Sequence, residues 1–201
     1  MRKTVFIILS LLLPAIMCGA KQDANAVMRR AAANILTSRG IMATFAVTGE
    51  YSIKGTVKIS GKKFSVTTGQ NSVWYNGKKM ATYNAKTSET VINVPDEEEL
   101  AEVNPLQYIA GWERMFSATM ASRQPKTGYA VLLKPRTKNS GIKAAVVTLD
   151  SNYWPRRIVM RTSSGAETAI SVTSLRNGIL HSAGSFEYPR KQYPKARIIN
   201  Y

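Results

Sequence analysis

The chain has 201 residues and is strongly basic, with 28 lysines and arginines against 12 acidic residues and a formal net charge of +16. Its one histidine excludes a metal site built from several histidines, and its one cysteine excludes a disulfide framework within the chain. A chain of this length can bury a substantial core as a single domain.

The first 20 residues have the pattern of an export signal. Arg2 and Lys3 precede an apolar run at 5–17, and small residues follow it. We expect cleavage after Ala20, which leaves a single domain at 21–201 with no cysteine and a net charge of about +14. The alternative is that Cys18 is acylated and anchors the chain to a membrane.

The basic charge bears on the choice of partner. An exported protein rarely meets nucleic acid, so we expect no nucleic-acid partner despite the charge. Anionic membrane surfaces and acidic proteins fit an exported basic chain better. A basic surface that only keeps the protein soluble stays open as an alternative.

After the signal, the chain changes from a helical to a strand-like pattern. Residues 23–38 are predicted to form one helix, with Asp23 as its N-cap and Val27, Ala31 and Ile35 on one face. Alternation of apolar and polar residues follows, which is typical of strands with one solvent-exposed face. Strands are expected near 41–48, 51–59, 63–68, 71–75, 79–83, 88–94, 128–134, 143–149, 156–162, 166–173, 178–186 and 195–200.

One hairpin signal stands out among these strands. Asn76-Gly77 lies between two runs that contain apolar and aromatic residues, and this pair favours a two-residue type I′ turn. We therefore predict a hairpin whose strands carry Trp74 and Met80.

A helical segment interrupts the strands at 104–121. Leu106, Ile109, Trp112 and Phe116 recur there at helical spacing. About eleven strands with few helices bury one sheet face most simply when the sheet curls and the helices lie across its mouth. The prediction is a mainly β protein, with a large antiparallel sheet around an apolar cavity.

Catalysis has little support in the sequence. A nucleophilic triad would have to use His181, but the chain has no GxSxG motif and this histidine lies in a strand-like stretch. There is no phosphate-binding glycine loop or dinucleotide fingerprint, so no cofactor is indicated. We interpret the chain as a binding protein rather than an enzyme. A pair of carboxylates placed for glycoside hydrolysis cannot be tested from spacing in sequence.

Four stretches in the same order resemble the LolA-type family of outer-membrane lipoprotein carriers, the periplasmic lipoprotein chaperones of Gram-negative bacteria. The stretches are SRGIMATFAV, NGKKMATYNAKTSETVINVPDEEELAEVNPLQYI, YAVLLKP and FEYPRKQYPKARIINY. Two features depart from the family pattern. Ala81 stands where the family usually has tryptophan, and VKISGKKF lacks the arginine that holds the helical lid shut in many members.

The resemblance implies a half-open antiparallel barrel with a helical lid over an apolar cavity. It also implies a periplasmic monomer that takes acylated lipoproteins from an inner-membrane transporter to an outer-membrane acceptor. The cavity wall would then include Phe45, Ile53, Val57, Phe64, Val66, Trp74, Met80, Ile158 and Met160. The lid helices would present Leu106, Ile109, Trp112 and Phe116.

Several alternatives stay open at this point. Each of these residues can equally belong to an ordinary core between sheet and helices. The same fold also suits an outer-membrane-anchored lipoprotein acceptor, or a periplasmic sensor that binds a lipid or a protein without releasing it. An exported hydrolase that uses His181 is a further, less favoured interpretation.

Overall fold

The computed structural model describes residues 22–50, 52–96, 99–100, 103–104, 106–137 and 141–201. The predicted export signal at 1–20 and its Cys18 lie outside the described residues. Within the described part of the chain, no helix is long and apolar enough to cross a membrane.

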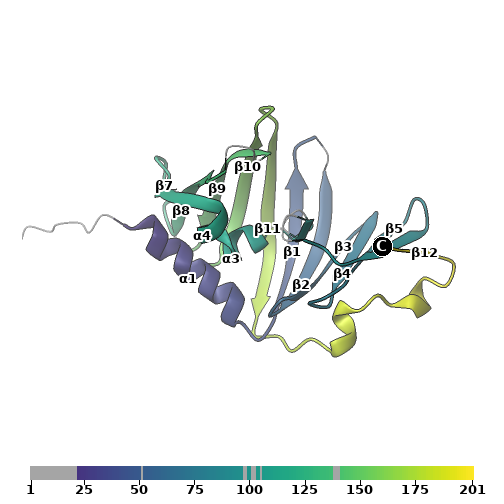
Figure 1. Ribbon diagram of the computed structural model, residues 1–201. Coiled ribbons are helices and arrows are strands. Elements are labelled where there is room, and N and C mark those ends of the chain that lie inside the picture. Colours follow the sequence, from purple (N-terminus) through teal and green to yellow (C-terminus); the bar gives the residue numbers. More distant parts are fainter. Residues whose placement is uncertain (1–21, 51, 97–98, 101–102, 105, 138–140) are drawn as a thin grey trace, which may run out of the picture.

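The described residues form one twelve-stranded sheet with a few short helices (Figure 1). The strands are β1 Ile41–Thr48, β2 Ile53–Ser60, β3 Lys63–Thr68, β4 Asn71–Tyr75, β5 Met80–Asn84, β6 Glu89–Asn93, β7 Phe116–Met120, β8 Tyr129–Pro135, β9 Ile142–Leu149, β10 Pro155–Thr162, β11 Glu167–Asn177 and β12 Arg197–Asn200. The helices are α1 Ala24–Thr37, α3 Leu106–Ala110 and α4 Trp112–Met115, and 3-10 turns form at η1 Ala183–Phe186 and η2 Arg190–Gln192.

The strand order is β12-β6-β5-β4-β3-β2-β1-β11-β10-β9-β8-β7. Neighbouring strands are antiparallel except for the β12–β6 pair, which is parallel. The sheet is not closed, because β7 and β12 are its two edges. The predicted mainly β, half-open barrel is therefore confirmed, with twelve strands where about eleven were expected.

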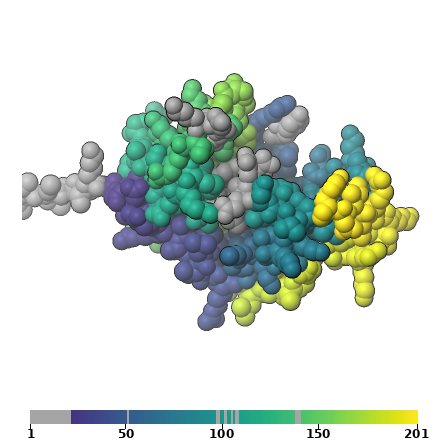
Figure 2. All heavy atoms as spheres, in the orientation of Figure 1, coloured from purple at the N-terminus to yellow at the C-terminus, as the bar shows by residue number. Residues whose placement is uncertain are grey.

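The first helix forms where the sequence predicts it. Asp23 caps α1, and its carboxylate accepts a hydrogen bond from the backbone N–H of Asn25 at 2.9 Å. The apolar stripe of α1, which includes the fully buried Met28, faces the sheet, and α1 packs against α3, β7 and β8. Figures 1 and 2 place the start of α1 and the C-terminus at opposite ends of the molecule.

The two faces of the sheet have different side chains. Val57 pairs with Ala43 on β1 and with Val66 on β3, so these three side chains lie on one face, here called the inner face. The inner face and the helices together form the main core. Along each strand, residues alternate between this face and the opposite, outer face, which carries residues such as Thr56 and Ser65.

The helical prediction for 104–121 is wrong at its C-terminal end. Helix α4 ends at Met115, and Phe116 begins strand β7, which pairs with β8 along Leu133 and its neighbours. The apolar spacing of Phe116 and Met120 fits a strand face as well as a helical one, so spacing alone could not separate the two. Backbone pairing with β8 makes this segment a strand.

The strand predicted at 178–186 is also wrong. These residues are irregular and end in the 3-10 turn η1. They open a segment, residues 178–196, here called the C-terminal segment, that packs on β3 and β4 before β12 joins the sheet. Gly40 allows its close approach, because a Cβ there would lie 2.1 Å from the carbonyl oxygen of Ile179.

The hairpin at Asn76-Gly77 forms, but not through the predicted two-residue turn. Tyr75 pairs with Met80, which leaves a four-residue loop at 76–79. Gly77 has a positive φ of 94°, whereas Asn76 is not among the described residues with positive φ. The Asn76 side-chain oxygen instead accepts from the backbone N–H groups of the two lysines that follow Gly77, at 3.0 and 2.9 Å. This Asx turn closes the loop in place of type I′ geometry.

Attachment of the last strand should depend on pH. Arg197 on β12 hydrogen-bonds to Glu89, its register partner on β6, and this bond lowers the pKa of the Glu89 carboxyl. A lowered pKa in the folded state means that the stabilisation is complete above the carboxyl's ordinary pKa of about 4.3 and is lost as pH falls through the lowered value. We expect the protection of the β12 amides, corrected for the intrinsic pH dependence of exchange, to fall below about pH 4, whereas Arg197→Gln should be less protected than the parent above that pH and similar to it below. Identical pH profiles for the two proteins would contradict this.

Candidate functional site

An apolar cavity of about 40 Å³ lies between the inner face and α3. Apart from one asparagine, its lining is apolar: Ala43, Phe45, Val57, Val66, Asn104, Leu106, Ile158, Ile170, Val172 and Leu175. Its volume has room for no more than about three water molecules. The cavity is thus nearly filled by its own walls when the helices lie in this position.

Strand pairing brings the wall residues together from both halves of the sheet. Ala43 on β1 pairs with Leu175 on β11, and Phe45 pairs with Val172. The register shifts between these two pairs, which leaves Thr173 as an extra residue on β11. This bulge lets Val172 and Leu175, three positions apart, face the same cavity.

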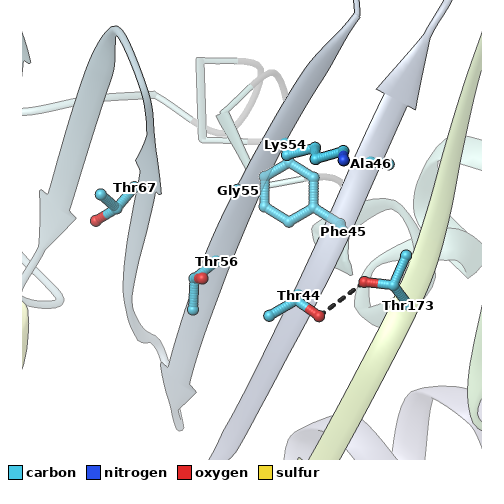
Figure 3. A pocket seen from close by; sticks show the side chains of 8 residues that line it. All are labelled: Thr44, Phe45, Ala46, Lys54, Gly55, Thr56, Thr67 and Thr173. Atoms are coloured by element: carbon cyan, nitrogen blue, oxygen red, sulfur yellow. Dashed lines mark hydrogen bonds between the residues drawn. The ribbon is translucent and has the colours of Figure 1, made fainter.

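A glycine shapes one side of the cavity. The Phe45 ring lies against Gly55, where an added Cβ would come within 2.5 Å of the ring (Figure 3). Any larger residue at Gly55 would push the ring toward the cavity. Gly55 therefore sets the position of a wall residue without contributing a side chain.

Helices α3 and α4 are here called the lid, after the role that the resemblance predicts for them, and Leu106 of α3 lines the cavity. Ile109 and Trp112 are buried in the core. Arg29 on α1 forms an ion pair with the Glu113 carboxylate at 3.1 Å, and Arg136 donates to the Glu113 carbonyl oxygen at 2.9 Å. Both contacts are exposed and each contributes about 0–1 kcal/mol, so apolar packing holds most of the lid in place.

Comparison with known proteins identifies the family. The family described as outer membrane lipoprotein carrier protein LolA matches residues 16–164. The chain belongs to the LolA family. No curated protein matches the sequence.

One solved structure shares this fold at low sequence identity, and two others are similar to it with TM-scores below 0.5. An uncharacterized conserved protein from Thermus thermophilus superposes with a TM-score of 0.63 and 16% identity, covering 90% of this chain and 100% of that one. A putative outer membrane lipoprotein-sorting protein domain from Vibrio parahaemolyticus has a TM-score of 0.49 and 11% identity, over 86% and 100% of the two chains. A LolA superfamily protein from Nitrosomonas europaea has a TM-score of 0.42 and 9% identity, over 85% and 96%. At such identities the likeness concerns the fold alone.

Within this LolA-family fold, the predicted wall and lid residues divide into groups. Five predicted residues line the cavity: Phe45, Val57, Val66, Ile158 and Leu106. Others are buried in the surrounding core without lining it: Phe64, Met80, Ile109, Trp112 and Phe116. Met160 is half-buried and packs against that core, whereas Ile53, at the start of β2, is 39% exposed. Their role toward an acyl chain stays a prediction.

Trp74 is not on the inner face, which corrects the expectation that it is a wall residue. Its ring packs edge-on against Tyr188 and Tyr193 of the C-terminal segment, with centroids 5.6 and 5.7 Å apart. Tyr83 joins the same cluster, with its ring tilted against that of Tyr193 and the centroids 4.2 Å apart. Alternation explains the error, because Val73 and Tyr75 on either side of Trp74 occupy the inner face.

Five lining residues were absent from the prediction: Ala43, Asn104, Ile170, Val172 and Leu175. A signal existed for Ala43, because it lies two positions from the predicted Phe45 on β1, whereas no residue of β11, the strand of Ile170 and Val172, was predicted. The bulge at Thr173 hid Leu175, since it breaks the period of two. Asn104 gave no signal, because a polar residue is not expected in an apolar wall.

The outer face has a larger but open hollow of about 610 Å³ over β1, β2, β3 and β11 (Figure 3). Threonines form much of its lining, and the hydroxyls of Thr44 and Thr173 hydrogen-bond at 2.7 Å. Lys54 adds a charge. A hollow this open to solvent cannot shield an apolar chain from water, so the cavity under the lid is the better candidate.

His181 has a structural contact in the part of the chain described here. Its Nε2 lies 2.9 Å from the carbonyl oxygen of Ile41, and its ring packs edge-on against Phe186. These contacts fasten the C-terminal segment to β1. No group of three histidine, cysteine, aspartate or glutamate side chains among the described residues is placed to hold a metal ion.

Proposed function

We propose that the protein is a periplasmic carrier that binds the acyl chains of lipoproteins under the lid and moves them from the inner to the outer membrane. The observation that supports this most is the apolar cavity between the inner face and α3, within a fold of the LolA family. Binding, not catalysis, is the proposed activity. The proposal takes residues 21–201 as one exported, monomeric domain.

Energetics explain why a carrier needs such a site. Each CH₂ group moved out of water is worth about 0.8 kcal/mol, so an acylated anchor cannot cross an aqueous compartment unshielded. A cavity of about 40 Å³ is too small for an acyl chain, so the lid must move outward on binding. Lid packing is lost when the acyl chain enters and is regained when it leaves, which keeps binding reversible.

The proposed route has two protein partners in addition to the lipoproteins. An inner-membrane transporter would deliver the acylated lipoprotein, and an outer-membrane acceptor would receive it. The strongly basic surface, with a formal charge of +16 over the whole chain, suits acidic partners or anionic headgroups at either end.

A release assay tests the carrier role. Purified mature protein is added to spheroplasts of a bacterium that makes it, and the supernatant is probed for acylated lipoproteins. We expect release in a soluble one-to-one complex. Absence of release, with the transporter shown to be active by a known carrier, would contradict the carrier role and favour an acceptor or a sensor of the same fold.

Filling the cavity should abolish binding without unfolding the protein. Ala43 is buried and lines the cavity, so Ala43→Phe places a ring where the acyl chain must enter. Ala145 is also buried on the inner face but does not line the cavity, which makes Ala145→Phe the matched control. Each change should cost about 1–3 kcal/mol of stability.

Titration of a fluorescent fatty-acyl probe separates the two variants. We expect Ala43→Phe to weaken binding at least about tenfold, which corresponds to about 1.4 kcal/mol, and Ala145→Phe to bind as the parent does. Equal affinities for the two variants would place the acyl site elsewhere.

A further inference from the structure

The wall of the apolar cavity contains one buried amide whose donor is unused. Asn104 is fully buried, and its side-chain oxygen accepts a hydrogen bond from the backbone N–H of Leu106 at 3.2 Å. That bond fixes which end of the amide is oxygen and which is nitrogen. Among the described residues, the amide nitrogen Nδ2 has no hydrogen-bond partner.

Capping of α3 explains the hydrogen bond that the Asn104 side-chain oxygen accepts, but it does not explain the NH₂ group. The acceptor oxygen holds the first turn of α3, as residues at a helix start commonly do. A serine or threonine hydroxyl could accept the same bond and would leave no buried NH₂ group. Buried donors are almost always paired, so an unpaired one at a candidate site points to a missing acceptor.

The position of Asn104 shows where that acceptor would be. Asn104 and Leu106 line both the cavity and a second small pocket of about 50 Å³ under α1, which Ile35 and Ile59 also line. The amide thus lies between the apolar cavity and a second, partly polar space that Lys62 also lines, at the start of the lid. Outward movement of the lid, which an acyl chain requires, would free space beside Nδ2.

We propose that Asn104 Nδ2 donates a hydrogen bond to the ester or amide carbonyl through which an acyl chain is joined to its carrier molecule. This inference rests on the proposed function and specifies its ligand: chains attached through a carbonyl rather than plain alkyl chains. The carbonyl would lie at Asn104, and the hydrocarbon would run along the inner face toward Phe45 and Val172. The other lining side chains are apolar and offer no side-chain polar group to compete for the carbonyl.

Carbonyl recognition should appear as selectivity between two matched lipids. A net hydrogen bond in a buried site corresponds to about a tenfold difference in affinity. The probes are dioctanoylglycerol, which has ester carbonyls, and dioctyl-glycerol ether, which has the same chains without them. Each displaces a neutral, carbonyl-free fluorescent naphthylamine from the mature protein.

Two variants separate the amide donor from the cap. Asn104→Leu keeps the branched shape of the side chain and removes both functions. Asn104→Asp keeps an acceptor for the Leu106 N–H and, when its carboxyl is ionised, replaces the donor with a further acceptor. We expect the parent to prefer the ester about tenfold, and both variants to bind the ether as the parent does while losing the preference.

The outcomes distinguish this inference from the proposed function. Equal affinity of the parent for the ester and the ether would overturn the role of Asn104 and leave acyl binding in place. A preference that persists in both variants would overturn it as well. Failure of the parent to bind either lipid would overturn the proposed function and this inference together.

Discussion

Ile109→Ala is expected to bind a fluorescent acyl probe about tenfold more tightly than the parent protein, although it is less stable. Ile109 is fully buried on α3, and its truncation should remove about 2–5 kcal/mol of packing. Much of that packing holds the closed lid. A ligand that needs the open lid gains apparent affinity when the open fraction rises.

The control for this experiment is Phe186→Ala. Phe186 is equally buried but lies outside the main core, against His181 in the C-terminal segment. Denaturant unfolding should show a comparable loss of stability for the two variants, whereas probe titration should show tighter binding only for Ile109→Ala. Unchanged or weaker binding by folded Ile109→Ala would mean that the lid does not control access to the cavity.

Trp74→Ala is expected to destabilise the protein by about 3–5 kcal/mol and to leave acyl binding unchanged. The Trp74 ring holds Tyr188 and Tyr193, and through them the C-terminal segment, on the outer face. Its loss should expose these tyrosines, so chymotrypsin should cleave the C-terminal segment faster while the apolar cavity stays intact.

Tyr75→Ala provides the matched control for Trp74→Ala. Tyr75 is the next residue on β4, and it faces inward against Phe64, with ring centroids 5.4 Å apart. Its truncation should leave the C-terminal segment protected from chymotrypsin. A loss of probe binding in folded Trp74→Ala, with the segment still protected, would restore Trp74 as a wall residue.

Local patterns in the sequence predicted most elements of this fold. Asp23 marked the start of α1, and the alternation around Val57 and Val66 identified both the strands and their inner face. Both signals depend only on residues close together in the sequence. A capping side chain bonds to the helix turn that follows it, and side chains along a strand point to alternate faces. Five of the predicted site residues accordingly line the cavity.

The errors arose where partners distant in sequence decide the structure. Phe116 continues into a strand because β8 pairs with it, and residues 178–186 leave the sheet because they cover its outer face. Trp74 was assigned to the cavity wall because it is large and apolar. It lies on the outer face of the sheet instead, where aromatic residues of the C-terminal segment pack against it. Asn104 precedes a proline, as a helix N-cap often does, but its place in the wall of the cavity depends on the sheet opposite, which no local pattern reveals.

The central pairing of β1 with β11 has a consequence for when the cavity comes into existence. Most pairings within β2–β6 and within β7–β10 join near neighbours in the chain, whereas β1 must find β11, and β6 must find β12, across long stretches of sequence. Contacts between distant segments close long loops and form slowly. Ala43 and Leu175 come from opposite sides of this pairing. A newly made chain therefore has no such cavity until nearly all of it is present and its two halves have joined.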